Sequence, residues 1–414
     1  MDCKFDWCTH VSKFNDIVTL SSGGWIDGNI EVDVIRMQRN LQPTITCNPS
    51  VVSGDSDMLL PKKTVDAQWW YYHGHLLAGS NRYSFHVAFF RYDSRGVRIG
   101  RIFPLKILGD EVDFAHASLT DHQAGQTWFA HQKSFRRRGV ASTGTLAFEI
   151  GEWTLRVDDF SHQLQANLGE VSIDLELQPS KPMTVYGQHG LFGDALPRKS
   201  SYCCYPRMKA DGEIHTPSGT LSVSGDGWMD REFGQIGPDS TVAGWDWMAI
   251  QFDDDSELML YWMLLRENSA RKLRGALIDR AGQHQILTES DISLQPTEYW
   301  RSAQTGAKYP TCWSVLIPKE RIDVEVRSCF DEAEFDTRGS TSIFYREGPA
   351  EVSGLQAEKR ICGRAFMESV GHDTKWNLGC YNAATQNMPL LGYLRNEMRS
   401  LLPGSSTSFT RHNQ

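Results

Sequence analysis

The chain has no net positive charge and no long apolar run, and each absence excludes a class of protein. Its 414 residues carry 42 Lys and Arg against 51 Asp and Glu, a formal net charge of −9. A nucleic-acid binder needs a concentrated positive field for its phosphate contacts, so we expect no nucleic-acid partner. No stretch approaches the roughly 20 apolar residues that span a bilayer, so we expect no integral membrane segment.

Signals for secretion and for disulfide scaffolds are also missing. The first residues do not place a charged region before an apolar one, as a signal peptide does. The nine cysteines are odd in number, scattered along the chain, and form no C-x-x-C pair. We therefore expect reduced thiols and a cytoplasmic protein.

The common cofactor and nucleophile motifs are absent as well. The sequence has no G-x-S-x-G elbow, no Walker A loop, no H-E-x-x-H and no G-x-G-x-x-G between a strand and a helix. His73 and His75 lie on one side of a predicted strand, as two zinc ligands would. Because no third ligand is identifiable, pocket or core roles for these two rings are commoner, and we expect no metal and no other cofactor.

Aromatic residues and alternating segments are abundant. There are 13 Trp, 13 Tyr and 19 Phe, and apolar residues alternate with polar ones at 83–90, 152–157 and 172–177. Such short strands, separated by Gly, Asp, Asn and Ser turns, predict an all-β protein of sandwich or barrel type. Helix signals are few, and the clearest one covers 389–402.

The alternation lapses in one stretch, which suggests a domain boundary. Between Gln178 and Arg207 the chain is rich in Pro and Gly, and alternation restarts near Glu213. We therefore place a boundary near residue 205. The expected organisation is an irregular N-terminal segment (1–60), two β-domains (61–205 and 206–380), and a C-terminal helix and tail (381–414).

Two segments, 66–75 and 225–247, embed polar groups in aromatic runs. A carboxyl group among Trp rings is costly unless it is paired, and an apolar setting raises its pKa towards the range that suits a general acid. The candidate catalytic residues on this ground are Asp230, Glu232 and Asp246.

An alternative stays open for the first two of these acids. Asp230 and Glu232 could instead belong to a buried ion-pair network with Arg231 and Arg207 that fixes the domain junction. In an extended strand the two acids share a face with Trp228, roughly 7 Å apart. If that face lines a pocket, we expect the pair to titrate as a coupled unit, with one member protonated at neutral pH.

Six short motifs together resemble one family. They are Gln-Trp-Trp-Tyr-Tyr-His-Gly-His-Leu (68–76), Tyr-Cys-Cys-Tyr-Pro-Arg (202–207), Gly-Trp-Met-Asp-Arg-Glu-Phe-Gly (227–234), Gly-Trp-Asp-Trp (244–247), Leu-Met-Leu-Tyr (258–261) and Gly-Arg-Ala-Phe-Met-Glu (363–368). They resemble the strands of the AttH / carotenoid 1,2-hydratase (hydroxyneurosporene synthase) family over roughly residues 65–375. The resemblance implies two lipocalin-like antiparallel β-barrel domains packed together.

The family resemblance narrows function less than fold. Proteins of this resemblance include hydratases that add water to a carotenoid double bond, and lipocalin-like Diels–Alderases that close rings. The hydratase branch has D-H-N-W-G where this chain has Asp230-Arg231-Glu232-Phe233-Gly234, so its His and Trp are replaced by Arg231 and Phe233, and of the Asp, His and Trp only the aspartate is retained. Because of this difference, carotenoid hydration is a weaker hypothesis than cyclisation.

The leading hypothesis is therefore a cofactor-independent cyclase or isomerase, Diels–Alderase-like, acting on a hydrophobic polyene or terpenoid-like intermediate of secondary metabolite biosynthesis. The alternatives are hydration of an alkene and non-catalytic binding of a hydrophobic small molecule by a lipocalin-like barrel. The sequence fixes no oligomeric state. The expected substrate-binding residues are Trp69, Tyr71, His73, Trp228, Trp245, Trp247 and Tyr261.

Overall fold

The fold is known from a computed structural model. It describes residues 55–63, 65–94, 98–99, 103–104, 110–136, 146–158, 161–186, 191–192, 200–234, 242–265, 271–341, 343–372 and 410–413. The expected irregular segment up to residue 54 and the expected helix at 389–402 lie outside these residues. Of the residues described, 73% are in strands and 2% in α-helix.

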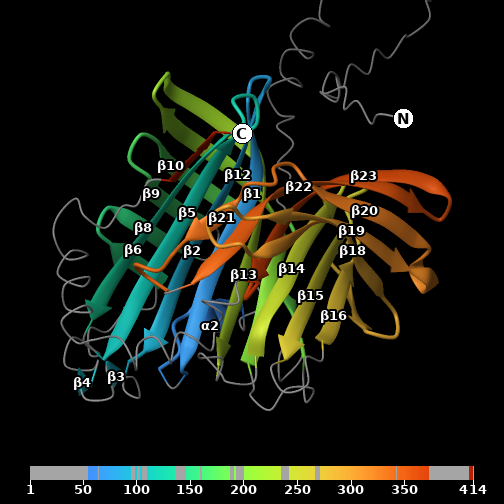
Figure 1. The fold of residues 1–414 in the computed structure, drawn as a ribbon, viewed down its shortest axis with the longest axis horizontal. Coiled ribbons are helices and arrows are strands. Elements are labelled where there is room, and N and C mark those ends of the chain that lie inside the picture. The colour runs from blue at the N-terminus through green and yellow to red at the C-terminus, as the bar shows by residue number, and fades with distance from the viewer. Residues whose placement is uncertain are drawn as a thin grey trace, which may run out of the picture. The chain divides into compact units, whose positions relative to one another are not determined.

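The first sheet contains twelve strands, all paired antiparallel (Figure 1). Their order is β24-β6-β5-β2-β1-β13-β12-β10-β9-β8-β7, with β11 paired to β12. Their bounds are β1 (Ala67–Ala78), β2 (Asn81–Asp93), β5 (Glu111–Asp121), β6 (Gln126–Arg136), β7 (Leu146–Ile150), β8 (Trp153–Val157), β9 (His162–Asn167), β10 (Ser172–Pro179), β11 (Thr184–Val185), β12 (Ser200–Thr216), β13 (Gly219–Gly234) and β24 (Thr410–Asn413).

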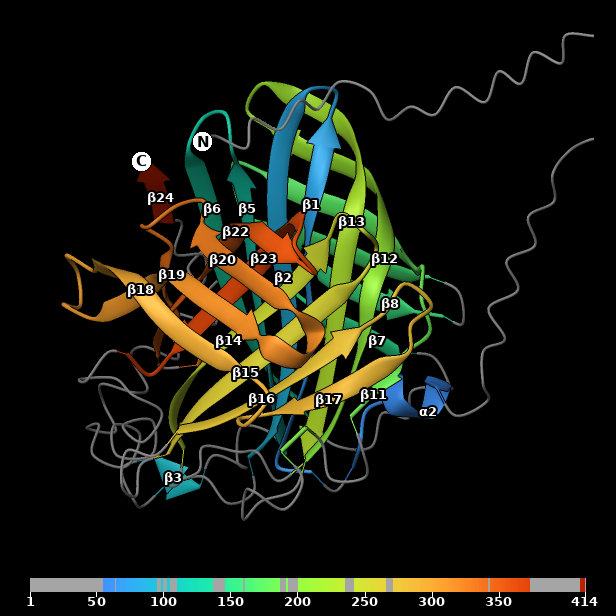
Figure 2. The same ribbon diagram turned by 90° about the vertical axis from the view of Figure 1, so that its right-hand side faces the viewer.

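The second sheet contains ten antiparallel strands and faces the viewer in Figure 2. The order is β17-β16-β15-β14-β23-β22-β20-β19-β18, with β21 paired to β22. The bounds are β14 (Val242–Phe252), β15 (Glu257–Leu265), β16 (Arg271–Ile278), β17 (His284–Thr288), β18 (Ser293–Arg301), β19 (Lys308–Ile317), β20 (Ile322–Ser328), β21 (Glu334–Asp336), β22 (Phe344–Gln356) and β23 (Lys359–Val370). The remaining elements are the helix α2 (Asp55–Leu59), the single-turn helix η3 (Pro318–Glu320) and the pair β3 (Arg98–Ile99) and β4 (Phe103–Pro104).

Alternation along the strands explains how each sheet encloses its own core. In β10, Ile173, Leu175 and Leu177 are buried, while Asp174 and Glu176 are exposed. Side chains of a strand point alternately to opposite faces, so an alternating sequence gives one apolar and one polar face. The two sheets are curled antiparallel sheets of lipocalin-like type, which confirms the predicted all-β fold.

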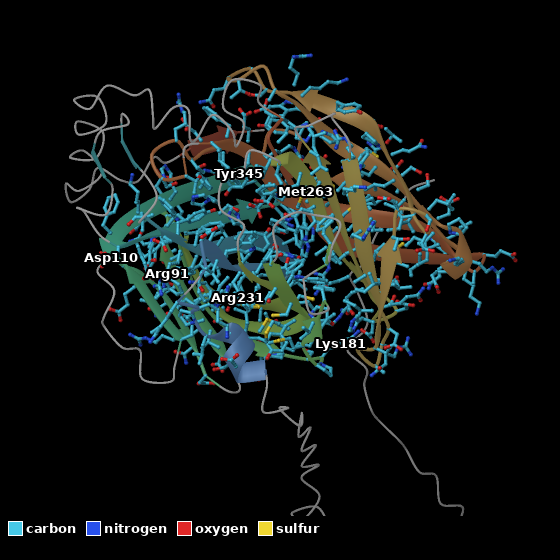
Figure 3. The ribbon with its side chains drawn as sticks, turned by 90° about the horizontal axis from the view of Figure 1, so that it is seen from below. Arg91, Asp110, Lys181, Arg231, Met263 and Tyr345 are labelled. Atoms are coloured by element: carbon cyan, nitrogen blue, oxygen red, sulfur yellow. The ribbon has the colours of Figure 1, made fainter. Side chains whose placement is uncertain are left out.

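A third cluster of buried side chains lies between the two sheets (Figure 3). Along β1, Trp70 and Tyr72 point into the core of the first sheet, whereas Tyr71 belongs to the third cluster. Along β14, Met248 packs in the core of the second sheet and Trp247 in the third cluster. The faces of the two sheets that point away from their own cores therefore pack against each other.

The chain passes from the first sheet to the second between Gly234 and Val242. The expected boundary near residue 205 lies inside β12, which pairs with β10 and β13. At the end of the stretch where alternation lapses, the register of β12 shifts between Tyr205 and Met208. The division of the chain into domains otherwise stays a prediction.

No helix among the described residues is both long enough and apolar enough to cross a bilayer.

Candidate functional site

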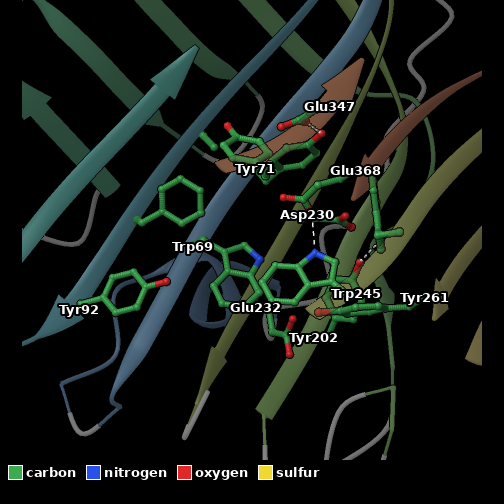
Figure 4. Close-up of a pocket in the computed structure, with 14 residues that line it drawn as sticks. Trp69, Tyr71, Tyr92, Tyr202, Asp230, Glu232, Trp245, Tyr261, Glu347 and Glu368 are labelled. Carbon is green, nitrogen blue, oxygen red and sulfur yellow. Dashed lines mark hydrogen bonds between the residues drawn. The ribbon is translucent and has the colours of Figure 1, made fainter. Parts of the chain in front are cut away.

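A pocket lies between the two sheets, and both contribute to its walls (Figure 4). Its cavity volume is about 70 Å³, room for a few water molecules or one small functional group, so the rest of any larger ligand has to displace pocket side chains or lie outside this cavity. The lining residues are mostly aromatic or acidic: Trp69, Tyr71, Ala88, Phe90, Tyr92, Tyr202, Asp230, Glu232, Trp245, Trp247, Tyr261, Tyr345, Glu347 and Glu368.

Cross-strand pairs of the first sheet build one wall. Tyr71 of β1 lies opposite Asp230 of β13, and Trp69 lies opposite Glu232. On the other side of β13, Tyr202 of β12 is the partner of Glu232. Residues directly opposite each other on neighbouring strands share a face. The two acids are therefore held between aromatic side chains on both sides.

Cross-strand pairs of the second sheet build the other wall. Trp247 of β14 lies opposite Tyr261 of β15 on one side and opposite Glu368 of β23 on the other. Glu368 in turn lies opposite Glu347 of β22. Two carboxylates in this position would repel each other strongly, so the pairing favours retention of a proton by at least one of them.

Asp230 is held by donors from aromatic side chains. The indole Nε1 of Trp228 donates to its Oδ1 at 2.9 Å, and the hydroxyl of Tyr202 is hydrogen-bonded to the same carboxyl group. The indole Nε1 of Trp247 donates to the Tyr202 oxygen at 3.1 Å, which extends the chain of hydrogen bonds to the second sheet. Burial raises the pKa of Asp230 to about 8, even though both hydrogen bonds act to lower it.

The other three acids also have raised pKa values. Burial raises the pKa of Glu232 and of Glu368 to about 7. Burial, together with the neighbouring Glu368, raises the pKa of Glu347 well above its usual range. Donors again hold the second-sheet acids: Trp245 Nε1 donates to Glu368 at 2.8 Å, and the Tyr71 hydroxyl donates to Glu347.

The arginines that could have neutralised Asp230 and Glu232 make their side-chain contacts elsewhere. Arg231 points to the opposite face of β13, where it donates to Gln68 Oε1 at 2.9 Å and stacks on Trp70 at 3.8 Å. Arg207 donates from Nε to Glu257 at 2.7 Å. Asp230 and Glu232 therefore line the pocket, and the ion-pair network involves other residues.

Asp246 is not part of the pocket lining. It accepts hydrogen bonds from Ser369 at 2.7 Å and His372 at 2.8 Å, and it pairs with Arg271 at 3.3 Å. The reason is strand alternation: its neighbours Trp245 and Trp247 both point into the pocket, so Asp246 points to the other face of β14. These partners lower its pKa in spite of its burial, which suits a structural ion pair.

Five of the seven expected binding residues line the pocket, and two lie behind it. Trp228 is fully buried and contacts Asp230 through its indole nitrogen. His73 stacks on Phe366 at 4.8 Å and lies edge-on to Trp247, with no hydrogen-bond partner for either ring nitrogen. Burial lowers its pKa well below the usual value, so the ring is neutral.

Sequence reasoning missed two acids and several aromatic residues of the pocket. Glu368 ends the motif at 363–368, so its position there was a usable signal. Glu347 carried no such signal, because only the pairing of β22 with β23 brings it to the pocket. The other missed lining residues are Ala88, Phe90, Tyr92, Tyr202 and Tyr345.

The arrangement suits proton donation to an apolar molecule. A protonated carboxyl group can donate a proton or a hydrogen bond, and aromatic faces stabilise nearby positive charge. Among the residues described, no three His, Cys, Asp or Glu side chains are grouped as metal ligands would be.

Comparisons with known proteins agree with this architecture. An AttH protein of Nitrosomonas europaea is similar in structure, with TM-score 0.65 and 24% identity, covering 76% of this chain and 94% of that one. Kievitone hydratase of Nectria haematococca is similar with TM-score 0.58 and 14% identity, covering 73% of this chain and 88% of that one. No curated protein matches the sequence. The family model described as AttH-like matches residues 56–372, and the chain belongs to the AttH-like family.

Proposed function

We propose that this protein is a cofactor-independent enzyme that cyclises or isomerises a hydrophobic polyene or terpenoid-like molecule. The observation that carries the proposal is the buried Asp230, hydrogen-bonded by two aromatic donors inside an aromatic pocket. A pKa of about 8 means that this carboxyl group keeps its proton at pH 7 and can present it to a bound substrate.

The proposed reaction begins at the Asp230 carboxyl group. Its O–H bond breaks as a C–H bond forms at one carbon of a substrate double bond, which leaves positive charge on the other carbon. A second double bond of the same molecule closes a ring on that carbon, which moves the positive charge to the far carbon of this second double bond. A neighbouring C–H bond then breaks, its electrons form the final double bond, and its proton passes to the Asp230 carboxylate, which restores the acid. The faces of Trp69, Trp245 and Trp247 stabilise the positive charge during these steps.

Positioning supplies a further part of the rate. A flexible polyene must fold before its ends can react, and holding it folded can supply about 7–11 kcal/mol in well-oriented intramolecular reactions. For a concerted ring closure, Asp230 would only donate a hydrogen bond, and positioning would be the main contribution.

One observation favours hydration as a second candidate. Glu347 and Glu368 belong to the wall opposite Asp230, and the cavity has room for water. A carboxylate there could take a proton from water as that water adds to a protonated double bond.

The test is product formation from a panel of acyclic isoprenoids and linear polyenes, in D₂O and in ¹⁸O-labelled water. Deuterium without ¹⁸O in the product supports proton-initiated cyclisation or isomerisation, whereas ¹⁸O supports hydration. Asp230→Asn should lower turnover by about 10²–10⁴, while Glu213→Gln, on the exposed side of β12, should leave it unchanged. Binding of panel members without any product would contradict the proposal and favour the non-catalytic binder.

A further inference from the structure

The charged residues that line the pocket, among those described, are all acidic. Four of its lining residues are acids, and no Lys, Arg or His is among the described residues that line it. Burial raises the pKa values of Glu232 and Glu368 to about 7, so both carboxyl groups are partly ionised at neutral pH and give the pocket a negative charge.

Among the described residues no Lys or Arg forms an ion pair with a pocket carboxyl group, although the charge of Arg231, on the opposite face of β13, acts to lower the pKa of Glu232. His86 approaches Glu347 at 3.5 Å, but burial lowers its pKa to about 3, so the ring is uncharged. Arg346, next to Glu347 in β22, points to the other face and donates to the main-chain oxygens of Asp331 and Phe330. Arg271 is paired with Asp246 behind β14.

The aromatic walls of the pocket also favour a positively charged ligand. Three indoles and five phenols line the pocket, and the faces of such rings attract cations, more strongly when water is excluded. Their N–H and O–H groups are partly used in holding the acids: Trp245 on Glu368, Tyr71 on Glu347 and Tyr202 on Asp230. A ligand in the pocket therefore contacts the ring faces and the carboxyl lone pairs that these donors leave unused.

The geometry fits an organic cation better than a metal ion. The acids belong to three strands in two opposing sheets, and no three of them are grouped as metal ligands would be. A metal ion needs several oxygen ligands within about 2.6 Å, whereas an ammonium group on an apolar body can contact carboxylates and ring faces spread around a cavity.

We propose that the preferred ligand of this pocket is an apolar molecule carrying a protonated nitrogen. The inference takes the pocket as the substrate site of the proposed function and names the substrate class: a polyene or terpenoid-like molecule with a basic amine. The ammonium group lies against the carboxyl groups of Glu232 and Glu368, apart from the double bond that Asp230 protonates in the proposed reaction.

Binding of such a ligand is coupled to protons. An ammonium ion favours the ionised form of Glu232 and Glu368, so its binding releases protons at neutral pH, whereas Asp230, with its higher pKa, keeps the proton that the proposed reaction needs. Burial raises the pKa values of Tyr71, Tyr202, Tyr261 and Tyr345.

The first experiment compares three eight-carbon probes on the unmodified protein: octylammonium, 1-octanol and octanoate. Affinity is measured by the fluorescence of the pocket tryptophans and by the rise in melting temperature. At pH 8 we expect octylammonium to bind at least about tenfold tighter than 1-octanol, and octanoate to bind most weakly. The affinity for octylammonium should rise from pH 6 to pH 8, and calorimetry in two buffers of different ionisation enthalpy should detect proton release.

The second experiment removes the charge. Glu232→Gln and Glu368→Gln should each reduce the preference for octylammonium over 1-octanol and flatten its pH dependence. Glu213→Gln is the control and should change neither. Variants that fail to fold leave the probe series on the unmodified protein as the deciding measurement.

Equal affinity for octylammonium and 1-octanol, a flat pH dependence, or no proton release would overturn the inference. These binding results do not depend on turnover. Product formation from a neutral isoprenoid without any preference for ammonium would overturn only this inference. A preference for ammonium in a protein whose turnover survives Asp230→Asn would instead remove the proposed role of Asp230.

Discussion

The raised pKa of Asp230 makes a quantitative prediction about stability. In the unfolded chain this carboxyl group ionises near pH 3.9, whereas in the folded protein its pKa is about 8. Between these values the folded state holds a proton that the unfolded state has lost. The free energy of unfolding therefore falls as pH rises, by about 1.4 kcal/mol per pH unit for this one group, and the loss is complete only above pH 8.

Asp230→Asn removes the titration but keeps the shape of the side chain. The Asn oxygen can still accept from Trp228, while the hydrogen bond with Tyr202 is weakened, at a cost of about 1 kcal/mol that does not depend on pH. The ionisation penalty that the variant escapes is about 4 kcal/mol at pH 7. The variant should therefore be more stable than the unmodified protein at pH 7, by about 3 kcal/mol.

The measurement is urea unfolding at pH 5, 6, 7 and 8 for both proteins. The difference in unfolding free energy should grow by about 3 kcal/mol between pH 5 and pH 7. Asp174→Asn, on the exposed face of β10, is the matched control and should give a constant difference. A constant difference for Asp230→Asn would mean that the carboxyl group is not held protonated. A difference that shrinks with pH would mean that a cation stabilises its ionised form.

Two further predictions concern the buried carboxylate of Glu257 and the indole that donates to Asp230. Glu257→Gln should destabilise the protein by about 3–5 kcal/mol, since Lys181 and Arg207 each contact this fully buried carboxylate at 2.7 Å. The measurement is urea unfolding, with Glu325→Gln on an exposed face as the control. A loss of stability below about 1 kcal/mol would contradict the prediction. Trp228→Phe removes a donor that lowers the pKa of Asp230, so the pH at which the infrared C=O band of the protonated carboxyl disappears should rise; a fall, or no change, would contradict the role given to the indole.

Much of the architecture was predictable because it follows from local patterns. Alternation at 172–177 corresponds to β10, and the segment 225–234 forms the second half of β13. The same alternation put Asp230 and Glu232 on one face, and both line the pocket. The rule also applied to Asp246, since a residue between two pocket tryptophans has to point away from the pocket.

The rest of the site depends on pairings between distant strands. Glu347 reaches the pocket because β22 lies beside β23, and β23 lies beside β14. A one-residue change in either register would move its side chain to the other face. No local sequence pattern encodes the register of these strand pairs, so the position of Glu347 in the pocket could not be predicted from the sequence.

The strict alternation of β13 has a consequence for how readily this protein can change. Met229 packs in the core of the first sheet, whereas the adjacent Asp230 faces the pocket. Packing in the core of the first sheet and ligand choice are therefore encoded at different positions of one strand. A library that varies Trp69, Tyr71, Asp230 and Glu232 alters the pocket wall while the side chains of β1 and β13 in the core of the first sheet are retained. This separation lets one scaffold diversify its chemistry by single substitutions, and it makes the pocket a practical starting point for directed evolution.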